Sequence, residues 1–168
     1  MEQLAVCDGF AAMRVNVSGS AACLVPLFEQ WRARPGQMLL ERYGMTELGM
    51  ASSNPYHGER RAGHVGQPLP GIQVHLFGED DQPIVDEETP GEIRVKDPNV
   101  FLEYWDNERA TRESFRDGWF CTGDMAVLEQ GYYRIMGRTS IDIIKVINCR
   151  RWRSKPGSLP ILISRKPP

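Results

Sequence analysis

The chain has 168 residues, enough for one domain or for parts of two. Hydrophobic residues make up 41% of it and charged residues 25%, which excludes a disordered or a fibrous protein. No apolar run reaches the roughly 18 residues of a membrane-spanning helix, and the N-terminus lacks the basic start and apolar stretch of a secretory signal. We therefore expect a protein without a transmembrane segment.

Cysteine spacing and charge exclude further kinds of site. The four cysteines stand far apart without a C-x-x-C pair, so we expect free thiols in a reducing, intracellular compartment rather than a zinc site or a disulfide framework. The net charge of −2 hides a basic tail, because residues 146–168 hold six basic residues and no acidic one. This tail has a single aromatic residue, Trp152, and a proline-rich end, and we expect no nucleic-acid partner.

The first half of the chain predicts a strand, a helix and a long loop. Residues 13–17 alternate and run into the small residues of SGSAA, as a strand does where it ends in a loop. Apolar residues recur at helical spacing over residues 24–31, and the Pro35-Gly36 pair ends this helix. The polar residues 41–63 predict a loop of a length that is usually functional or disordered.

The second half predicts a β-rich region with one helix. Residues 72–76 and 91–95 alternate as strands do, and the turn sequence GEDDQP follows the first of them. Residues 107–115 have helix character, and a further strand is predicted over residues 132–136. Together these elements indicate a mixed α/β fold.

Four short stretches carry groups of the kind that hold a phosphorylated ligand. Small residues at 18–21 let a ligand approach the backbone, and the YGMTE sequence at 43–47 offers an aromatic face, a hydroxyl and a carboxylate suited to Mg²⁺. Asp124 follows a predicted glycine turn and suits the two hydroxyls of a ribose, while Arg138 is a fixed cation after a strand. Taken singly, each stretch also fits an ordinary turn, a capping residue or a solvated surface.

The order and spacing of these stretches resemble the adenylate-forming acyl-CoA synthetase superfamily. The matching segments, in family order, are SGSAA, ERYGMTE, GHVGQPLPGIQV, GEIRVKDPNVFLEYW, DGWFCTGD and GYYRIMGRTSIDIIK. The match as a whole covers roughly residues 13–145. Within the superfamily, RYGMTE, SNPYHGERRAG and GRTSIDIIK make the chain most similar to malonate–CoA ligases. The resemblance implies an α/β fold, the C-terminal part of the large N-terminal domain of an acyl-adenylate-forming enzyme with its β-rich subdomain.

The resemblance also implies a two-step ligation that uses ATP, Mg²⁺ and CoA. A carboxylic acid and Mg·ATP would form an acyl-adenylate and pyrophosphate, and the CoA thiol would then displace AMP. This chemistry requires that two anions be held together while charge at the α-phosphate is stabilised. The partners implied are small molecules, namely the acid, ATP and CoA. The implied location is intracellular, in the cytoplasm or the mitochondrion.

Several motifs bind the nucleotide in relatives of this kind. The residues implied to bind ATP or AMP here are Ser18, Gly19, Ser20, Tyr43, Gly44, Thr46, Asp124 and Arg138. The SGS residues would line the adenine and AMP side of the site, and Tyr43 would lie against the adenine. Asp124 would take the ribose hydroxyls, with Arg138 beside them.

Three residues are implied to act in catalysis. Thr46 would contact the α-phosphate, Glu47 would bind Mg²⁺, and Lys145 would approach the phosphate or the acyl end in the adenylating conformation. The second carboxylate of malonate needs a cation, because an unpaired buried charge is costly. Arg60 and Arg61 stand where relatives carry such an arginine, and the spacing leaves open which of them serves or whether both are surface arginines.

Both ends of the chain depart from the family pattern. Nothing before SGSAA supplies the phosphate-binding loop with its lysine, and the basic tail replaces the family's glycines after Lys145. We expect a chain cut at both ends, with a partial AMP-binding domain over residues 1–138, the start of a hinge over 139–145 and an unrelated tail over 146–168. A shift of reading frame or a retained intron would explain the tail. The alternative function is a catalytically inactive product that at most binds a nucleotide or a partner.

Overall fold

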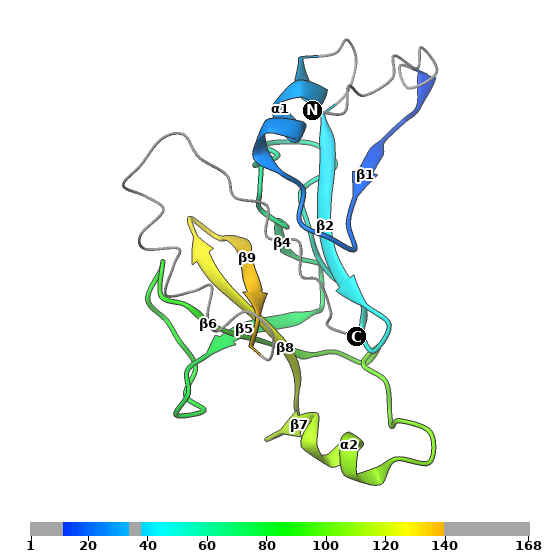
Figure 1. Cartoon of the computed structure of the whole chain (residues 1–168), viewed down its shortest axis with the longest axis vertical. Coiled ribbons are helices and arrows are strands. Elements are labelled where there is room, and N and C mark those ends of the chain that lie inside the picture. Colours follow the sequence, from blue (N-terminus) through cyan, green and yellow to red (C-terminus); the bar gives the residue numbers. More distant parts are fainter. Residues whose placement is uncertain (1–11, 34–37, 140–168) are drawn as a thin grey trace, which may run out of the picture.

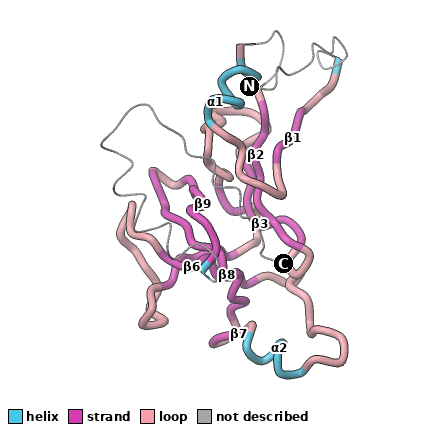
Figure 2. Tube along the Cα trace, in the orientation of Figure 1, coloured by secondary structure: helices cyan, strands magenta, loops and turns pink. Residues whose placement is uncertain are grey.

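Two β-sheets built around one core make up most of the molecule (Figure 1). A computed structural model of the chain describes residues 12–33 and 38–139. Over these residues the trace is mainly strand and loop, with short helices at its periphery (Figure 2). Within the same residues, no helix is long and apolar enough to cross a membrane.

The first sheet contains β1 (Asn16–Ser18), β2 (Leu39–Met45), β3 (Gly49–Ser53) and β4 (Gln67–Pro68), in that order across the sheet. β1 runs parallel to β2, and the other neighbours are antiparallel. Helix α1 (Val25–Arg32) connects the two parallel strands, and Pro26 stands in its first turn, where a missing N–H is tolerated. The predicted helix is confirmed, and the predicted strand is present at residues 16–18.

The second sheet contains β5 (Gln73–Phe77), β6 (Gly91–Lys96), β7 (Phe115–Arg116), β8 (Trp119–Glu129) and β9 (Tyr132–Arg138). Its strands are antiparallel in the order β5-β6-β8-β7, and β9 pairs with β8. Helix α2 (Glu108–Glu113) precedes β7, and the Asn107 side chain caps it by accepting a hydrogen bond from the Ala110 N–H. The strands and the helix predicted for this half are confirmed.

The prediction of a long loop over residues 41–63 is wrong, because β2 and β3 occupy much of this segment. The sequence hides these strands because several of the buried residues are polar: Glu41 is 4% exposed, Ser52 is 1% exposed and Asn54 is 2% exposed. Asn54 Nδ2 donates to Glu41 O at 3.0 Å and to His64 O at 2.6 Å. Hydrogen bonds therefore satisfy these buried groups, and the apolar alternation that would predict a strand is missing.

Main-chain hydrogen bonds join the two sheets. The Val65 N–H donates to Tyr133 O at 2.9 Å, and the Tyr133 N–H donates to Gly66 O at 2.8 Å. Side chains from both sheets then share a core, which contains Tyr43, Leu48, Ala51, Val74, Leu76, Ile93, Val95, Phe120, Ala126 and Tyr133. The segment before β4 and strand β9 therefore connect the first sheet to the second.

Several sequence predictions fall outside the described residues. β9 ends at Arg138, and the description stops at Thr139, so most of the predicted hinge, Lys145 and the basic tail lie beyond it. The proposed boundaries at residues 138 and 145 therefore stay predictions. Cys23 and Cys121 carry free thiols, as expected, and the other two cysteines lie outside the described residues.

Candidate functional site

A cavity of about 610 Å³ opens between the end of β2 and the paired strands β8 and β9. Its wall is formed by the end of β1 and the loop after it, by β2 and the turn that follows, by Gly63 and Val65, and by β8 and β9. The residues of the wall that the sequence singled out are Ser18, Ser20, Tyr43, Gly44, Thr46, Glu47, Asp124 and Arg138. Gly19 does not line the cavity. Motifs that are far apart in the sequence thus meet at one place.

Asp124 lies in this wall with only 8% of its surface exposed. Tyr43 Oη donates a hydrogen bond of 2.6 Å to Asp124 Oδ2, and Arg138 Nε donates to Asp124 Oδ1 at 2.8 Å. Burial, and then the hydrogen bond to Asp124, raise the pKa of Tyr43, so the phenol remains a neutral donor. Each carboxylate oxygen keeps a second lone pair, with which it can accept a hydrogen bond from a ligand hydroxyl.

A β-bulge in β8 carries Asp124 into the wall. The ladder between β6 and β8 is interrupted at Ile93, which faces the three residues Thr122, Gly123 and Asp124. Gly123 has a φ of 72°, a left-handed conformation that glycine adopts without strain. Thr122 Oγ1 donates to Ile93 O at 2.7 Å and accepts from the Asp124 N–H at 3.1 Å. The predicted glycine turn is therefore a bulge inside a long strand, where the extra residues bend the backbone and redirect a side chain.

The glycine of the YGMTE motif permits close contact between β2 and β3. The pairing of these strands shifts between Tyr43 and Gly44. A Cβ at residue 44 would lie 2.0 Å from Gly49 O, which is closer than these atoms can approach. Glycine at this position thus lets the end of β2 bring Tyr43 and the following Thr46-Glu47 turn to the cavity.

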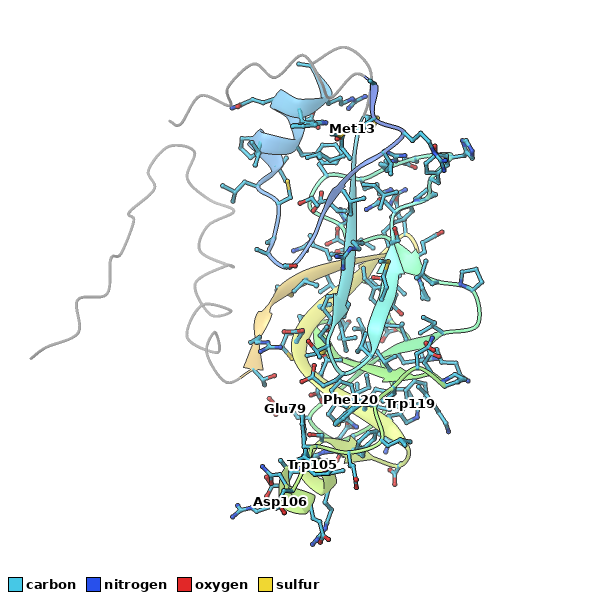
Figure 3. The ribbon with its side chains drawn as sticks, turned by 90° about the vertical axis from the view of Figure 1, so that its right-hand side faces the viewer. Met13, Glu79, Trp105, Asp106, Trp119 and Phe120 are labelled. Atoms are coloured by element: carbon cyan, nitrogen blue, oxygen red, sulfur yellow. The ribbon has the colours of Figure 1, made fainter. Side chains whose placement is uncertain are left out.

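Glu47 is held from the segment that leads to α2. The Phe101 N–H donates to Glu47 O at 2.7 Å, and Tyr104 Oη donates to Glu47 Oε1 at 3.0 Å. Burial and this hydrogen bond raise the pKa of Tyr104. Trp105, the next residue, is 93% exposed and lies near the end of the molecule that α2 forms (Figure 3). The segment therefore contacts Glu47 through Tyr104 and faces solvent through Trp105.

The donor set fits a magnesium ion that is bound together with phosphate oxygens. Over residues 12–33 and 38–139, no group of three or more His, Cys, Asp or Glu side chains could hold a metal ion by itself. Mg²⁺ commonly takes only one or two carboxylates and completes its shell with phosphate and water. Glu47, a carboxylate in the cavity wall, is suited to be such a ligand.

Glu41, Arg42 and Cys23 also line the cavity, and sequence patterns did not single them out as site residues. Glu41 accepts a hydrogen bond from the Gly63 N–H at 2.9 Å, and burial raises the pKa of its carboxyl. A Cβ at Gly19 would lie 3.3 Å from Arg42 Cζ, so this glycine packs against the Arg42 side chain instead of lining the cavity. For Glu41, its place two residues before Tyr43 was the available indication, because alternate residues of a strand share a face.

Arg60 and Arg61 do not line the cavity. Arg60 donates to three main-chain carbonyls of neighbouring segments. Arg61 pairs with Glu59 at 3.0 Å, and its guanidinium lies 4.2 Å from the ring centroid of Tyr132. Gly63, two residues after Arg61, does line the cavity. The loop that carries the arginines therefore reaches the site through its main chain.

The comparison with known proteins identifies the class to which this fold and cavity belong. Residues 4–105 match the family of AMP-binding enzymes, and the chain belongs to that family. It is 51% identical to the malonate–CoA ligase of Arabidopsis thaliana over 143 residues, which cover 83% of this chain and 23% of the relative. It is 49% identical to the mitochondrial malonate–CoA ligase of Mus musculus over 152 residues, which cover 79% of this chain and 26% of the relative.

Solved structures of acyl-CoA ligases have a region that matches the fold of this chain. ATP-bound MatB from Rhodopseudomonas palustris matches with a TM-score of 0.71 and 43% identity, over 75% of this chain and 25% of that one. A malonyl-CoA ligase product complex with methylmalonyl-CoA and AMP bound matches with a TM-score of 0.70 and 46% identity, over 77% of this chain and 28% of that one. The predicted fold class is therefore confirmed. The chain spans about a quarter of the length of the relatives it matches.

Proposed function

We propose that the chain forms the nucleotide-binding part of an ATP-dependent acid–thiol ligase, which activates malonate through an acyl-adenylate to its CoA thioester. The observation that carries this proposal is the bonding of Asp124 to Tyr43 and Arg138 in the wall of a cavity that also contains Glu47. Membership of the AMP-binding enzyme family and the names of the relatives support it. The proposed location is intracellular, in the cytoplasm or the mitochondrion.

In this proposal, Asp124 accepts the two ribose hydroxyls of ATP through the lone pairs that Tyr43 and Arg138 leave available. Because its Oη is bonded to Asp124, the Tyr43 ring has a fixed orientation, and we assign it to contact with the adenine. The remaining adenine and AMP side is assigned to Ser18, Gly19, Ser20 and Gly44. Gly19 acts there through the Arg42 side chain that packs against it.

The phosphates are assigned to the turn after β2. Thr46 is exposed, and its hydroxyl would donate to the α-phosphate, while the Glu47 carboxylate would bind the magnesium ion. When bound, Mg²⁺ supplies positive charge that neutralises the phosphate oxygens. Tyr104 keeps one Glu47 oxygen in place, which leaves the other oxygen for the metal. Lys145 is assigned to the phosphate or acyl end.

The second carboxylate of the acid is assigned to an arginine. Arg60 and Arg61 are the candidates, and the contact between their loop and the cavity at Gly63 supports a position near the substrate. Arg42 is a further candidate cation, because it lines the cavity itself. Replacement of each arginine by glutamine, with KM for malonate and for acetate as the readout, tests these assignments. Replacement of the arginine that binds the second carboxylate should raise KM for malonate and leave KM for acetate unchanged.

Thermal unfolding of the full chain with and without Mg·ATP tests the proposal, since a ligand that binds only the folded state raises Tm. We expect a cooperative transition that Mg·ATP raises by several degrees and that magnesium tripolyphosphate, which lacks the nucleoside, raises less. Failure of a saturating Mg·ATP concentration to move Tm would contradict nucleotide binding.

Nucleotide binding without turnover is the second candidate function. The observation in its favour is that the cavity wall formed by the described residues contains arginines but no lysine. An assay of the full chain with malonate, ATP and CoA separates the two candidates. Formation of AMP and malonyl-CoA supports the ligase, and Mg·ATP binding with no AMP formed supports the second candidate.

A further inference from the structure

Glu92, which does not line the cavity, contacts the bulge that supports Asp124. Strand β6 alternates, so that Ile93 and Val95, each 1% exposed, enter the core, while Glu92 and Arg94 share the opposite face. Strand β8 pairs with β6 edge to edge, and the irregular part of this pairing lies between Glu92 and Arg94. Glu92 is therefore placed by ordinary strand geometry beside the bulge.

The bulge leaves the Gly123 N–H without a strand partner, and Glu92 supplies the acceptor. The ladder between β6 and β8 skips Gly123, and the Gly123 N–H donates to Glu92 Oε1 at 3.1 Å. On the other side of the same residue, Thr139 Oγ1 donates to Gly123 O at 2.8 Å. The Gly123 N–H has no strand carbonyl opposite it, and the Glu92 carboxylate takes the place of that acceptor.

The Glu92 carboxylate is itself fixed. Its Oε2 accepts a hydrogen bond from Arg94 Nε at 2.9 Å, and the Arg94 side chain is only 6% exposed. The Arg94 guanidinium also pairs with Asp81 and lies 4.6 Å from the ring centroid of Phe77. A buried arginine with its own partners thus orients the carboxylate toward Gly123, so the position of the bulge does not depend on a freely rotating side chain.

We propose that Glu92 is a positioning residue for nucleotide binding, because it holds the bulge at Gly123 that aims the Asp124 carboxylate at the ribose hydroxyls. This inference rests on the proposed function and adds a residue outside the cavity to it. Gly123 immediately precedes Asp124, so a change in the Gly123 peptide plane moves the origin of the carboxylate. Such a movement would first weaken the hydrogen bonds between the Asp124 carboxylate and the two ribose hydroxyls.

The test compares ATP with 2′,3′-dideoxy-ATP, which lacks both hydroxyls, by calorimetric titration of the full chain in the presence of Mg²⁺. We expect the wild-type chain to bind ATP about tenfold more tightly than dideoxy-ATP. Glu92→Leu should reduce this ratio to about twofold or less while leaving the affinity for dideoxy-ATP nearly unchanged. Glu92→Gln keeps one acceptor oxygen for two donors, the Gly123 N–H and Arg94 Nε, and should give a ratio between those of the wild-type chain and Glu92→Leu.

Glu113→Leu is the matched control, since it also removes a glutamate–arginine pair, with Arg109 at 2.8 Å, but lies on α2 outside the cavity wall. It should keep the full ratio. If Glu92→Leu fails to fold by circular dichroism, Glu92→Asp, whose shorter side chain withdraws the carboxylate from Gly123, takes its place with the same expectation.

The possible failures are distinguishable. If the ratio of the two affinities stays unchanged in Glu92→Leu, whether or not both affinities fall, the positioning role is overturned and the proposed function is left intact. A wild-type chain that binds both nucleotides equally would overturn the assignment of Asp124 to ribose, and the inference with it. A wild-type chain that binds neither would overturn the proposed function itself.

Discussion

The bulge in β8 and the turn after β2 each bring a carboxylate to the same cavity, but they hold it differently. Asp124 in the bulge is 8% exposed, and its two oxygens are bonded to Tyr43 and Arg138. Glu47 in the turn is only half-buried, and its side chain is bonded to Tyr104 through one oxygen. One carboxylate is fixed at both oxygens, and the other keeps freedom at one.

The contrast matches the two ligand chemistries assigned to these regions. Recognition of two hydroxyls depends on direction, and a carboxylate fixed in advance loses less conformational entropy when it binds them. A magnesium ion brings its own octahedral shell of water and phosphate, so its protein ligand must be able to adjust. We infer that the rigid side of the cavity selects the nucleoside and that the less constrained side follows the metal.

Asp124→Ala removes the carboxylate from the rigid side of the cavity and should have the largest effect. The change leaves the buried Tyr43 hydroxyl without its acceptor, and we expect a loss of about 2 kcal/mol in the free energy of unfolding, measured by urea denaturation. The affinity for Mg·ATP should fall at least about tenfold. Asp86→Ala, at an exposed position outside the cavity wall, is the control and should change neither quantity. If Asp124→Ala bound Mg·ATP with wild-type affinity, the role of the rigid side in selecting the nucleoside would be contradicted.

Gly44→Ala disturbs the other side of the cavity. Its Cβ would collide with Gly49 O, so we expect a loss of about 2 kcal/mol in the free energy of unfolding. Gly71→Ala is a matched control, because residue 71 has a φ of 87° but open space around it, and it should cost only about 1 kcal/mol. Equal costs for the two variants in urea denaturation would show that close strand contact at Gly44 is unimportant.

Tyr104→Phe releases the Glu47 side chain from its hydrogen bond, while the Phe101 N–H still holds the Glu47 main chain. Loss of the hydrogen bond should change the free energy of unfolding by less than about 1 kcal/mol. We expect the magnesium concentration needed for half-maximal ATP binding to rise about threefold, as titration of Mg²⁺ at fixed ATP would measure. Tyr132→Phe removes a hydroxyl that donates to Glu59 O outside the cavity wall and should leave the titration unchanged. A wild-type titration curve for Tyr104→Phe would contradict the role of Tyr104.

Glu41→Gln tests a third carboxylate of the wall and should have the smallest effect. Burial raises the pKa of Glu41 above its ordinary value, so the folded chain gains stability from its protonation at low pH and loses that contribution as pH rises through the folded pKa. Glutamine removes the cost of the buried charge, and Tm should be slightly higher than in the wild-type chain near pH 7 and equal to it near pH 4. A lower Tm at both values would argue against a raised pKa.

The fold was predictable from the sequence where apolar residues alternate on a strand with one buried face. Residues 91–95 meet this condition, because Ile93 and Val95 enter the core. The segment 41–63 does not, since hydrogen bonds to Asn54 and other polar groups replace apolar contacts there. Sequence periodicity reports apolar burial and carries no information about polar groups that are buried with their partners.

The residues of the candidate site were predictable where they lie within a sequence motif. The order of the motifs indicated that Tyr43 and Asp124 belong to one site, although no local pattern brings them together. Glu92 was not predictable in this way, because its contact with Gly123 spans 31 residues and arises from an irregular strand pairing. Roles that depend on a neighbour in space appear only when the register of the sheet is known.

The hydrogen bond between Tyr43 and Asp124 joins residues 81 positions apart in the chain, and this separation governs when it forms during folding. The β2–β3 and β8–β9 pairs connect neighbouring segments and can form early, whereas closure between distant segments costs more chain entropy and is slower. In refolding experiments we therefore expect the circular dichroism signal of the strands to recover before the chain regains affinity for ATP. The recovery of nucleotide binding would then report the rate of the final step of folding.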